Sequence, residues 1–279
     1  MSRRQALSSS RLISYLVLSI FAIFTLFPVL QIISVSLRPA ATLHSTRLVL
    51  LPDDWTFDAY RKLFCETDFL LWLRNSAFVA LTVALTSILL ASPAGYALAR
   101  FPLRGKRFAL LFLISTQMFP VTMLLLPLFL IIVKLQLYDT YIGLSAIYAA
   151  TALPFCIWQM KGYYDTLPAS LEEAALLDGC GPWAAFFRVV FPLALPALTV
   201  TALFSFISAW SEYLVAAVML SDTALFTLPL GLKAFHSNFD TEWNLYAAAS
   251  LVVSLPVVAL FLLLSRFLIS GLTLGGVKG

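Results

Sequence analysis

The sequence predicts an all-α polytopic membrane protein with six transmembrane helices, and three observations support this fold class. Of its 279 residues, 61% are apolar and 11% are charged, whereas an ordinary soluble domain is about 45–50% apolar and about 25% charged. Six long intervals contain no charged residue, and each is long enough to cross about 30 Å of hydrocarbon. Lys and Arg cluster between particular intervals. This composition excludes both a disordered chain and a water-soluble enzyme.

The uncharged intervals define the predicted spans in order. They cover residues 12–37, 75–99, 108–133, 140–160, 189–211 and 243–265. The first interval follows three arginines, as the core of a signal peptide would, but its apolar run far exceeds the roughly 7–15 residues of such a core. We therefore expect a retained helix. Prolines are frequent inside the spans, and they either kink helices that must move or reflect the tolerance of membrane helices for proline.

The distribution of Lys and Arg predicts the orientation. The segment from Arg100 to Arg107 carries four basic residues and no acid, and short loops of this kind face the cytoplasm. The segment 212–242 is therefore expected on the outer side, where it either stays in water or re-enters the membrane surface. The predicted parts are a cytoplasmic N-terminus (1–11), the first span (12–37), an outer loop (38–74), a transmembrane core with the other five spans (75–265) and a cytoplasmic tail (266–279).

The spans contain no ionisable side chain at depth, which argues against an ion-coupled carrier, because such carriers bind or relay the ion through buried charges. Glu212, at the edge of a span, is the nearest candidate, so a carrier stays an alternative. His44 and His236 lack metal-ligand spacing, and the three cysteines show neither zinc nor disulfide spacing. The glycines near the C-terminus are followed by Val277 and form no P-loop. We expect no catalytic, cofactor or metal site, and the basic excess reflects topology rather than nucleic-acid binding.

The segment between the fourth and fifth spans has the most specific local pattern. Ser170 and Glu173 match a capping box, which predicts a short helix from about Leu171. Gly179 supplies the left-handed residue that ends this helix. Gly181-Pro182 then begins a second helix, with proline at the first position, where no hydrogen-bond donor is lost.

The second helix has one predicted apolar face, and Pro192 is expected to open the fifth span after it. The residues of that face recur at helical spacing and are Trp183, Phe186, Phe187 and Val190. The two helices would form a cytoplasmic knob, which Ala174 and Ala175 keep narrow. Three acids offer carboxylates to a basic partner: Glu172, Glu173 and Asp178. The alternative is a plain amphipathic connector in which Glu173 only caps its own helix.

These residues resemble a known family. Glu173-Ala174-Ala175, followed by Gly179, Phe186, Val189 and Pro192, is similar to the EAA loop of permease subunits in binding-protein-dependent ABC importers. The ending Gly271–Gly279 and the stretch Trp210-Ser-Glu-Tyr213 resemble the maltose-type, MalG-like branch, which imports carbohydrates. The sequence departs from the usual pattern at Cys180, where Ala is usual, and at Ser211, where Asn is common.

The resemblance implies a type I ABC importer permease fold in a bacterial inner membrane. It also implies a coupling loop at 161–191 that docks into an ATPase dimer, on which ATP and Mg are bound. Further implied partners are a second, MalF-like permease subunit and an extracytoplasmic sugar-binding protein or lipoprotein. The residues implied to contact the ATPase are Glu172, Glu173, Ala174, Ala175, Asp178 and Gly179, and the Gly-rich tail is a further candidate.

Substrate contacts are expected from aromatic and hydrogen-bonding side chains near span ends, because sugars are held by stacking and by hydrogen bonds. The candidates are Asn75, Gln117, Ser208, Trp210 and Tyr213. The alternative for the aromatic ones is an anchoring role at the membrane interface. The resemblance implies import of a di- or oligosaccharide. The alternatives are glycerol-3-phosphate or another small solute, an ion-coupled carrier, or a structural membrane protein.

Overall fold

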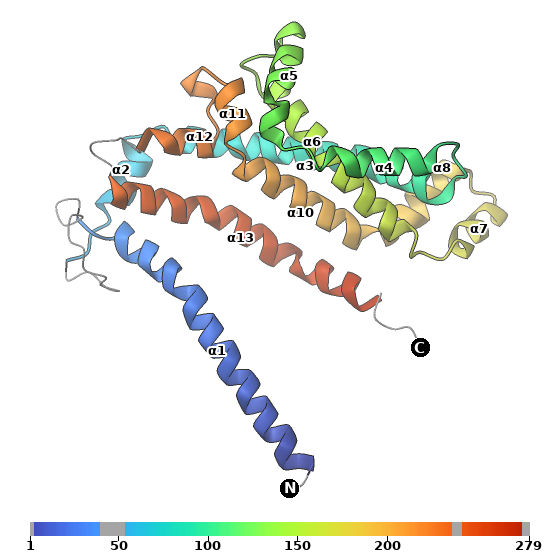
Figure 1. The fold of residues 1–279 in the computed structure, drawn as a ribbon, viewed down its shortest axis with the longest axis horizontal. Coiled ribbons are helices and arrows are strands. Elements are labelled where there is room, and N and C mark those ends of the chain that lie inside the picture. The colour runs from blue at the N-terminus through green and yellow to red at the C-terminus, as the bar shows by residue number, and fades with distance from the viewer. Residues whose placement is uncertain (1–2, 40–53, 236–241, 275–279) are drawn as a thin grey trace. The chain divides into compact units, whose positions relative to one another are not determined.

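A computed structural model describes residues 3–39, 54–235 and 242–274 of the chain (Figure 1). Within these ranges the chain is helical and no strand is found. It divides into two compact units: residues 1–69 with 232–254, and residues 70–231 with 255–279. The α-helices are α1 (Arg3–Ser36), α2 (Asp58–Cys65), α3 (Phe69–Arg100), α4 (Lys106–Thr116), α5 (Val121–Lys134), α6 (Tyr141–Tyr164), α7 (Ser170–Leu177), α8 (Pro182–Ala185), α9 (Phe191–Leu193), α10 (Leu195–Ser211), α11 (Leu214–Met219), α12 (Leu228–Leu232) and α13 (Trp243–Leu274).

The helices agree with six membrane crossings if two bent pairs are each counted as one span. Four helices are long and apolar enough to cross a membrane by themselves: Ile13–Ser36, Phe69–Arg100, Tyr141–Tyr164 and Trp243–Ser265. The bent pairs are α4 with α5, and the helical segment Pro182–Leu193 with α10. Each of the six predicted intervals therefore corresponds to a helix or to a bent pair.

The predicted third span is not one continuous helix. α4 and α5 meet at an angle of 103° across a break of four residues (Figure 1). Pro120 lies at the end of that break and has no N–H for the helical ladder. The ring of Pro120 also disfavours the α conformation at Phe119. The helix therefore stops at Thr116 and starts again at Val121.

The predicted fifth span is also not one continuous helix. Pro192 does not begin its long helix α10, which starts at Leu195; Pro192 lies in the preceding helical segment, which is bent by 75° relative to α10. Pro196 lies in the first turn of α10. Because Pro196 cannot donate to the carbonyl of Pro192 and its ring would crowd that carbonyl, the helix bends between the two prolines.

Several helices extend beyond the predicted intervals, because helix ends can carry charges that reach the water. α1 begins at Arg3 within the predicted N-terminal segment, and α3 begins at Phe69, before Arg74. The expected outer loop therefore contains α2 and ends earlier. α13 continues through much of the predicted tail to Leu274. The two histidines and the last five residues lie outside the described residues.

The unit that contains α1, α2 and the start of α13 is held by polar contacts between distant segments. Lys62 pairs with Glu242 at 2.6 Å, and the hydroxyls of Ser36 and Tyr60 lie 2.9 Å apart. The Asn244 amide donates to the carbonyl of Arg38 at 3.3 Å. These contacts join α1, α2 and α13 within one unit.

In the other unit, short helices follow α10, and two acids position them. Glu212 caps α11 by accepting from the backbone N–H groups of Val215 and Ala216, and Tyr148 of α6 donates to the same carboxylate at 2.9 Å. Asp139 accepts from the backbone N–H and hydroxyl of Ser221. Partial burial would raise the pKa of Asp139, but these hydrogen bonds outweigh burial and lower it. Because the carboxylate of Glu212 is bonded to α11 and to Tyr148, Glu212 is a structural group in this part of the chain.

Candidate coupling site

The first helix of the predicted knob is present, but the capping box is not. α7 begins at Ser170, after Ala169, which already has helical backbone angles (φ −61°, ψ −28°) and makes no side-chain cap bond. The backbone N–H groups of Glu172 and Glu173 both donate to the carbonyl of Ala169. The chain thus enters the helix one residue earlier than predicted, so Ser170 lies inside the first turn and cannot cap it.

Gly179 ends α7 as predicted. Its φ is +87°, a left-handed conformation that favours glycine. The N–H of Gly179 donates to the carbonyl of Leu176, and the N–H of Cys180 donates to that of Ala175. This pair of bonds is the Schellman motif, which satisfies carbonyl groups at the end of a helix.

The second predicted helix begins at Pro182 as expected, but its apolar residues do not share one face. Phe186 and Val190 are each 1% exposed, whereas Trp183 is 69% exposed and Phe187 is 57% exposed. Residues 186–190 form a π-helical turn in which the N–H of Phe191 donates to the carbonyl of Phe186. Residues four apart still share a face, since Phe186 and Val190 are both buried and Trp183 stacks on Phe187 at the surface, so the four residues define two faces.

An apolar core supports the two helices of the loop. Phe186 contacts the ring of Tyr96 at a centroid distance of 4.7 Å and that of Tyr164 at 6.4 Å. Val190 belongs to the same buried cluster. Ala175 is only 8% exposed, so a bulky side chain at this position would disturb the packing of the protein itself.

Glu172 is held inside the protein by α3. One carboxylate oxygen accepts from Nε of Arg100 at 2.5 Å, and the other accepts from the hydroxyl of Tyr96 at 2.8 Å. Arg100 also donates to the carbonyl of Leu167 at 2.9 Å, just before α7. The side chains of Arg100 and Glu172 are 16% and 12% exposed. Glu172 therefore has partners within the chain, unlike the outward-facing acid that the sequence suggested.

The other candidate contact residues of α7 lie at its surface. Glu173 and Ala174 are exposed, as are Asp178 and Gly179 at the end of the helix. Leu177 is 89% exposed. α7 thus presents a small surface that combines carboxylates with an apolar side chain.

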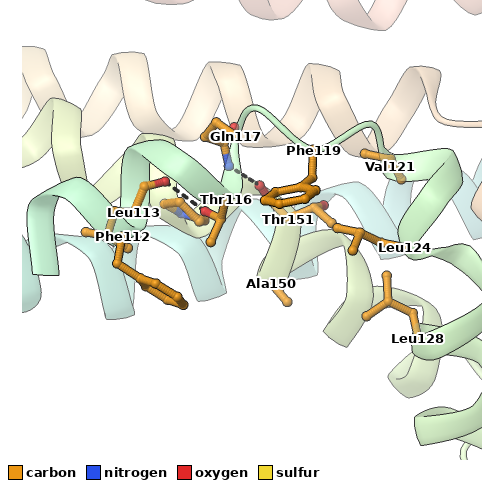
Figure 2. Close-up of a pocket in the computed structure, with 11 residues that line it drawn as sticks. Phe112, Leu113, Thr116, Gln117, Phe119, Val121, Leu124, Leu128, Ala150 and Thr151 are labelled. Atoms are coloured by element: carbon orange, nitrogen blue, oxygen red, sulfur yellow. Dashed lines mark hydrogen bonds between the residues drawn. The ribbon is translucent and has the colours of Figure 1, made fainter.

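A hollow of about 370 Å³ lies at the break between α4 and α5, beside α6 (Figure 2). Gln117 lines this hollow, and its amide donates to the carbonyl of Thr151 at 3.2 Å. Phe112 and Phe119 contribute rings to the lining. Pro154, also in the lining, provides no N–H for the carbonyl of Ala150, which leaves a helix carbonyl without its usual donor.

The other substrate candidates are dispersed and mostly buried. Asn75 is 1% exposed, and its amide donates to the carbonyls of Ala224 and Phe226, which fixes a loop. Trp210 is buried and stacks on Phe206 with ring centroids 5.3 Å apart. Ser208 and Tyr213 are half-buried on and just after α10. The residues that line the hollow include Gln117 and none of these four.

A comparison with protein families identifies the chain. Residues 88–273 match the family described as "binding-protein-dependent transport system inner membrane component". This match includes α7 and the bends on both sides of it. The chain belongs to this family. It is therefore a non-catalytic permease subunit of an inner-membrane transport system.

Individual relatives and a solved structure resemble this permease over nearly its whole length. The inner membrane ABC transporter permease protein YcjP of Escherichia coli K12 is 38% identical, with 97% of each chain covered. The maltodextrin transport system permease protein MdxG of Bacillus subtilis 168 is 33% identical, again with 97% of each chain covered. A chain of a bacterial ABC transporter involved in the import of the acidic polysaccharide alginate matches with a TM-score of 0.81 at 28% identity, covering 95% of this chain and 98% of that one.

Two residues of the permease site could not be assigned from sequence. Tyr96 and Arg100 lie four residues apart at the end of an apolar span, where Arg100 served only as a topology marker. The spacing shows that they share a helix face. Their shared partner Glu172 is 76 residues beyond Tyr96 and 72 beyond Arg100, so only the fold shows the contact.

Proposed function

We propose that this permease is the membrane-spanning subunit of an ABC importer that moves a di- or oligosaccharide into the cytoplasm. ATP hydrolysed with Mg on a partner ATPase dimer drives the movement. A second, MalF-like permease completes the channel, and an extracytoplasmic binding protein or lipoprotein delivers the sugar. The observation that carries the proposal is the likeness to a maltodextrin permease along 97% of both chains.

In this proposal α7 docks into the ATPase. The support is its outward surface: Glu173 offers an exposed carboxylate in the first turn, and Ala174 beside it keeps the helix narrow. Asp178 and Gly179 are exposed at the other end. Both termini and this loop would then lie in the cytoplasm, as the charge distribution predicts.

The sugar pathway would pass the hollow at the α4–α5 break. Gln117 and the carbonyl of Ala150 offer hydrogen-bonding groups there, and Phe119 offers an aromatic surface. A hollow of about 370 Å³ is within the roughly 300–1,000 Å³ of small-molecule sites. Asn75 and Trp210 would instead affect the pathway indirectly, because they hold the loops and helices against which they pack.

Reconstitution into vesicles tests the proposal. We expect ATP-dependent uptake of maltodextrin only when the chain is combined with the second permease, the ATPase and the binding protein that co-purify with it. Glu173→Ala should reduce ATPase retention by about tenfold or more, because it removes one partner of a desolvated ion pair. Glu66→Ala, the same change at another exposed glutamate, should not.

Other results would contradict the proposal in distinct ways. Uptake by the chain alone, driven by a proton gradient, would identify a secondary carrier. ATP-dependent uptake of glycerol-3-phosphate without any sugar would reject the sugar assignment. Normal ATPase retention by Glu173→Ala would leave no docking role for that carboxylate.

A further inference from the structure

One face of α3 carries three polar residues at intervals of four: Ser92, Tyr96 and Arg100. Residues with this spacing lie one above another along a helix. Ser92 bonds to the last residue of α6, and Tyr96 and Arg100 bond to the segment that follows it. The face therefore runs alongside the whole base of the candidate coupling site.

The contacts along this face begin at the end of α6. The hydroxyls of Ser92 and Tyr164 lie 2.7 Å apart, and both residues are fully buried. One turn further, Tyr96 donates to Glu172 of α7, and its ring packs at a tilt against Phe186 of the π-helical turn. At the last residue of α3, Arg100 bonds to both Glu172 and the carbonyl of Leu167. α3 thus binds the end of α6, the start of α7 and the second helix together.

Charge makes the central contact the strongest of these. Both carboxylate oxygens of Glu172 are used, one by a guanidinium group, and charge-assisted hydrogen bonds are about twice as strong as neutral ones. Glu172 also lies in the first turn of α7, where the helix dipole favours a negative charge. Because the pair is largely shielded from water, a change to either partner leaves an unpaired charge.

We propose that Glu172, Tyr96 and Arg100 are positioning residues that make α7 and α3 move as one body during transport. Glu172 acts from the inner side of α7, whereas the neighbouring Glu173 faces outward. Movement of the ATPase against α7 would then be transmitted directly to a membrane span through this contact. The inference rests on the proposed function, since it concerns how the same loop transmits movement.

The test uses the complete importer in vesicles and measures sugar taken up per ATP hydrolysed, together with the amount of ATPase retained. Glu172→Gln should keep the ATPase but lower the ratio by about tenfold, within the range by which single residues alter coupling. Reversal of the pair, Arg100→Glu with Glu172→Arg, should raise the ratio several-fold above that of either single variant. Glu242→Gln is the matched control, because it makes the same change in an ion pair outside the coupling loop, that of Lys62 and Glu242.

A wild-type ratio in Glu172→Gln would overturn the inference. An equal loss of the ratio in Glu242→Gln would also overturn it, as would a reversed pair whose ratio is no higher than that of the single variants. If Glu172→Gln fails to assemble, Tyr96→Phe decides, because it removes one hydroxyl and keeps the ring. If Tyr96→Phe then takes up as much sugar per ATP as the wild type, Glu172 contributes only to folding, and the inference is overturned. A wild-type complex without ATP-dependent uptake would instead contradict the proposed function.

Discussion

At the residue scale, Glu172 and Glu173 show how adjacent identical side chains acquire different surroundings. The first turn of α7 directs Glu172 toward Arg100 and Tyr96 and leaves Glu173 exposed. Helical geometry separates neighbouring residues by about 100° around the axis. The sequence alone predicted that both acids lie on the knob and face a partner. Only the packing against α3 shows that Glu172 faces inward and Glu173 outward.

Gly179 gives a prediction at this scale. Gly179→Ala should destabilise the protein by about 1–2 kcal/mol, because an L side chain is strained at its φ of +87°. A Cβ there would meet nothing within 4 Å, so the cost comes from the backbone alone. The melting temperature of the purified protein in detergent measures it.

Gly181→Ala is the control for this change. Gly181 also has open space around it, and its φ of −72° suits any residue. Its substitution should have a smaller effect. Equal melting temperatures for Gly179→Ala and the wild type would show that the left-handed turn is not needed.

At the element scale, a proline lies at each of the two places where a span bends. Pro120 ends the break between α4 and α5, and Pro196 lies in the first turn of α10 after the 75° bend. The sequence contained these prolines, but it also contained Pro93, Pro154 and Pro256, which lie inside continuous helices. Whether a proline bends or breaks a helix depends on the packing around it, because neighbouring groups can compensate for the lost hydrogen bond.

The close approach of α3 and α6 gives a prediction for these elements. A Cβ at Gly95 would lie 2.8 Å from Cβ of Met160 and 2.9 Å from the backbone nitrogen of Lys161. Gly95→Ala should therefore push the helices apart and cost about 1–3 kcal/mol of stability, as overpacking does.

The melting temperature in detergent again measures this effect. Gly162→Ala, in α6 and with nothing within 4 Å of the added Cβ, is the control. It should be neutral or stabilising by up to about 1 kcal/mol, because alanine favours helix. A stabilising Gly95→Ala would contradict the tight contact between α3 and α6.

At the scale of the whole molecule, the orientation proposed from charge can be tested with the native cysteines. Cys65 is exposed in the expected outer loop, Cys180 is half-buried in the expected cytoplasmic loop, and Cys156 is buried. A membrane-impermeant maleimide should label Cys65 in intact spheroplasts and reach Cys180 only after the membrane is opened. Cys156 should react only after denaturation.

Variants with one cysteine replaced by serine assign each labelled site. Labelling that disappears with Cys65→Ser and persists with Cys180→Ser supports cytoplasmic termini. Labelling of Cys180 in intact spheroplasts would reverse the orientation, and the docking of α7 to a cytoplasmic ATPase would fail with it.

The sequence by itself determined the class of protein, the six uncharged intervals and the place of the short helix α7 with its glycine end. Long uncharged intervals reflect the membrane around them, and glycine and proline act on the backbone next to them. Both kinds of feature can therefore be identified along the chain. The tertiary structure decided the bend angles, the burial of Phe186 beside an exposed Phe187, and the pairing of Glu172 with Arg100. These features depend on contacts between residues that are far apart in sequence, and hydrophobic spacing contains no information about which helix face meets which.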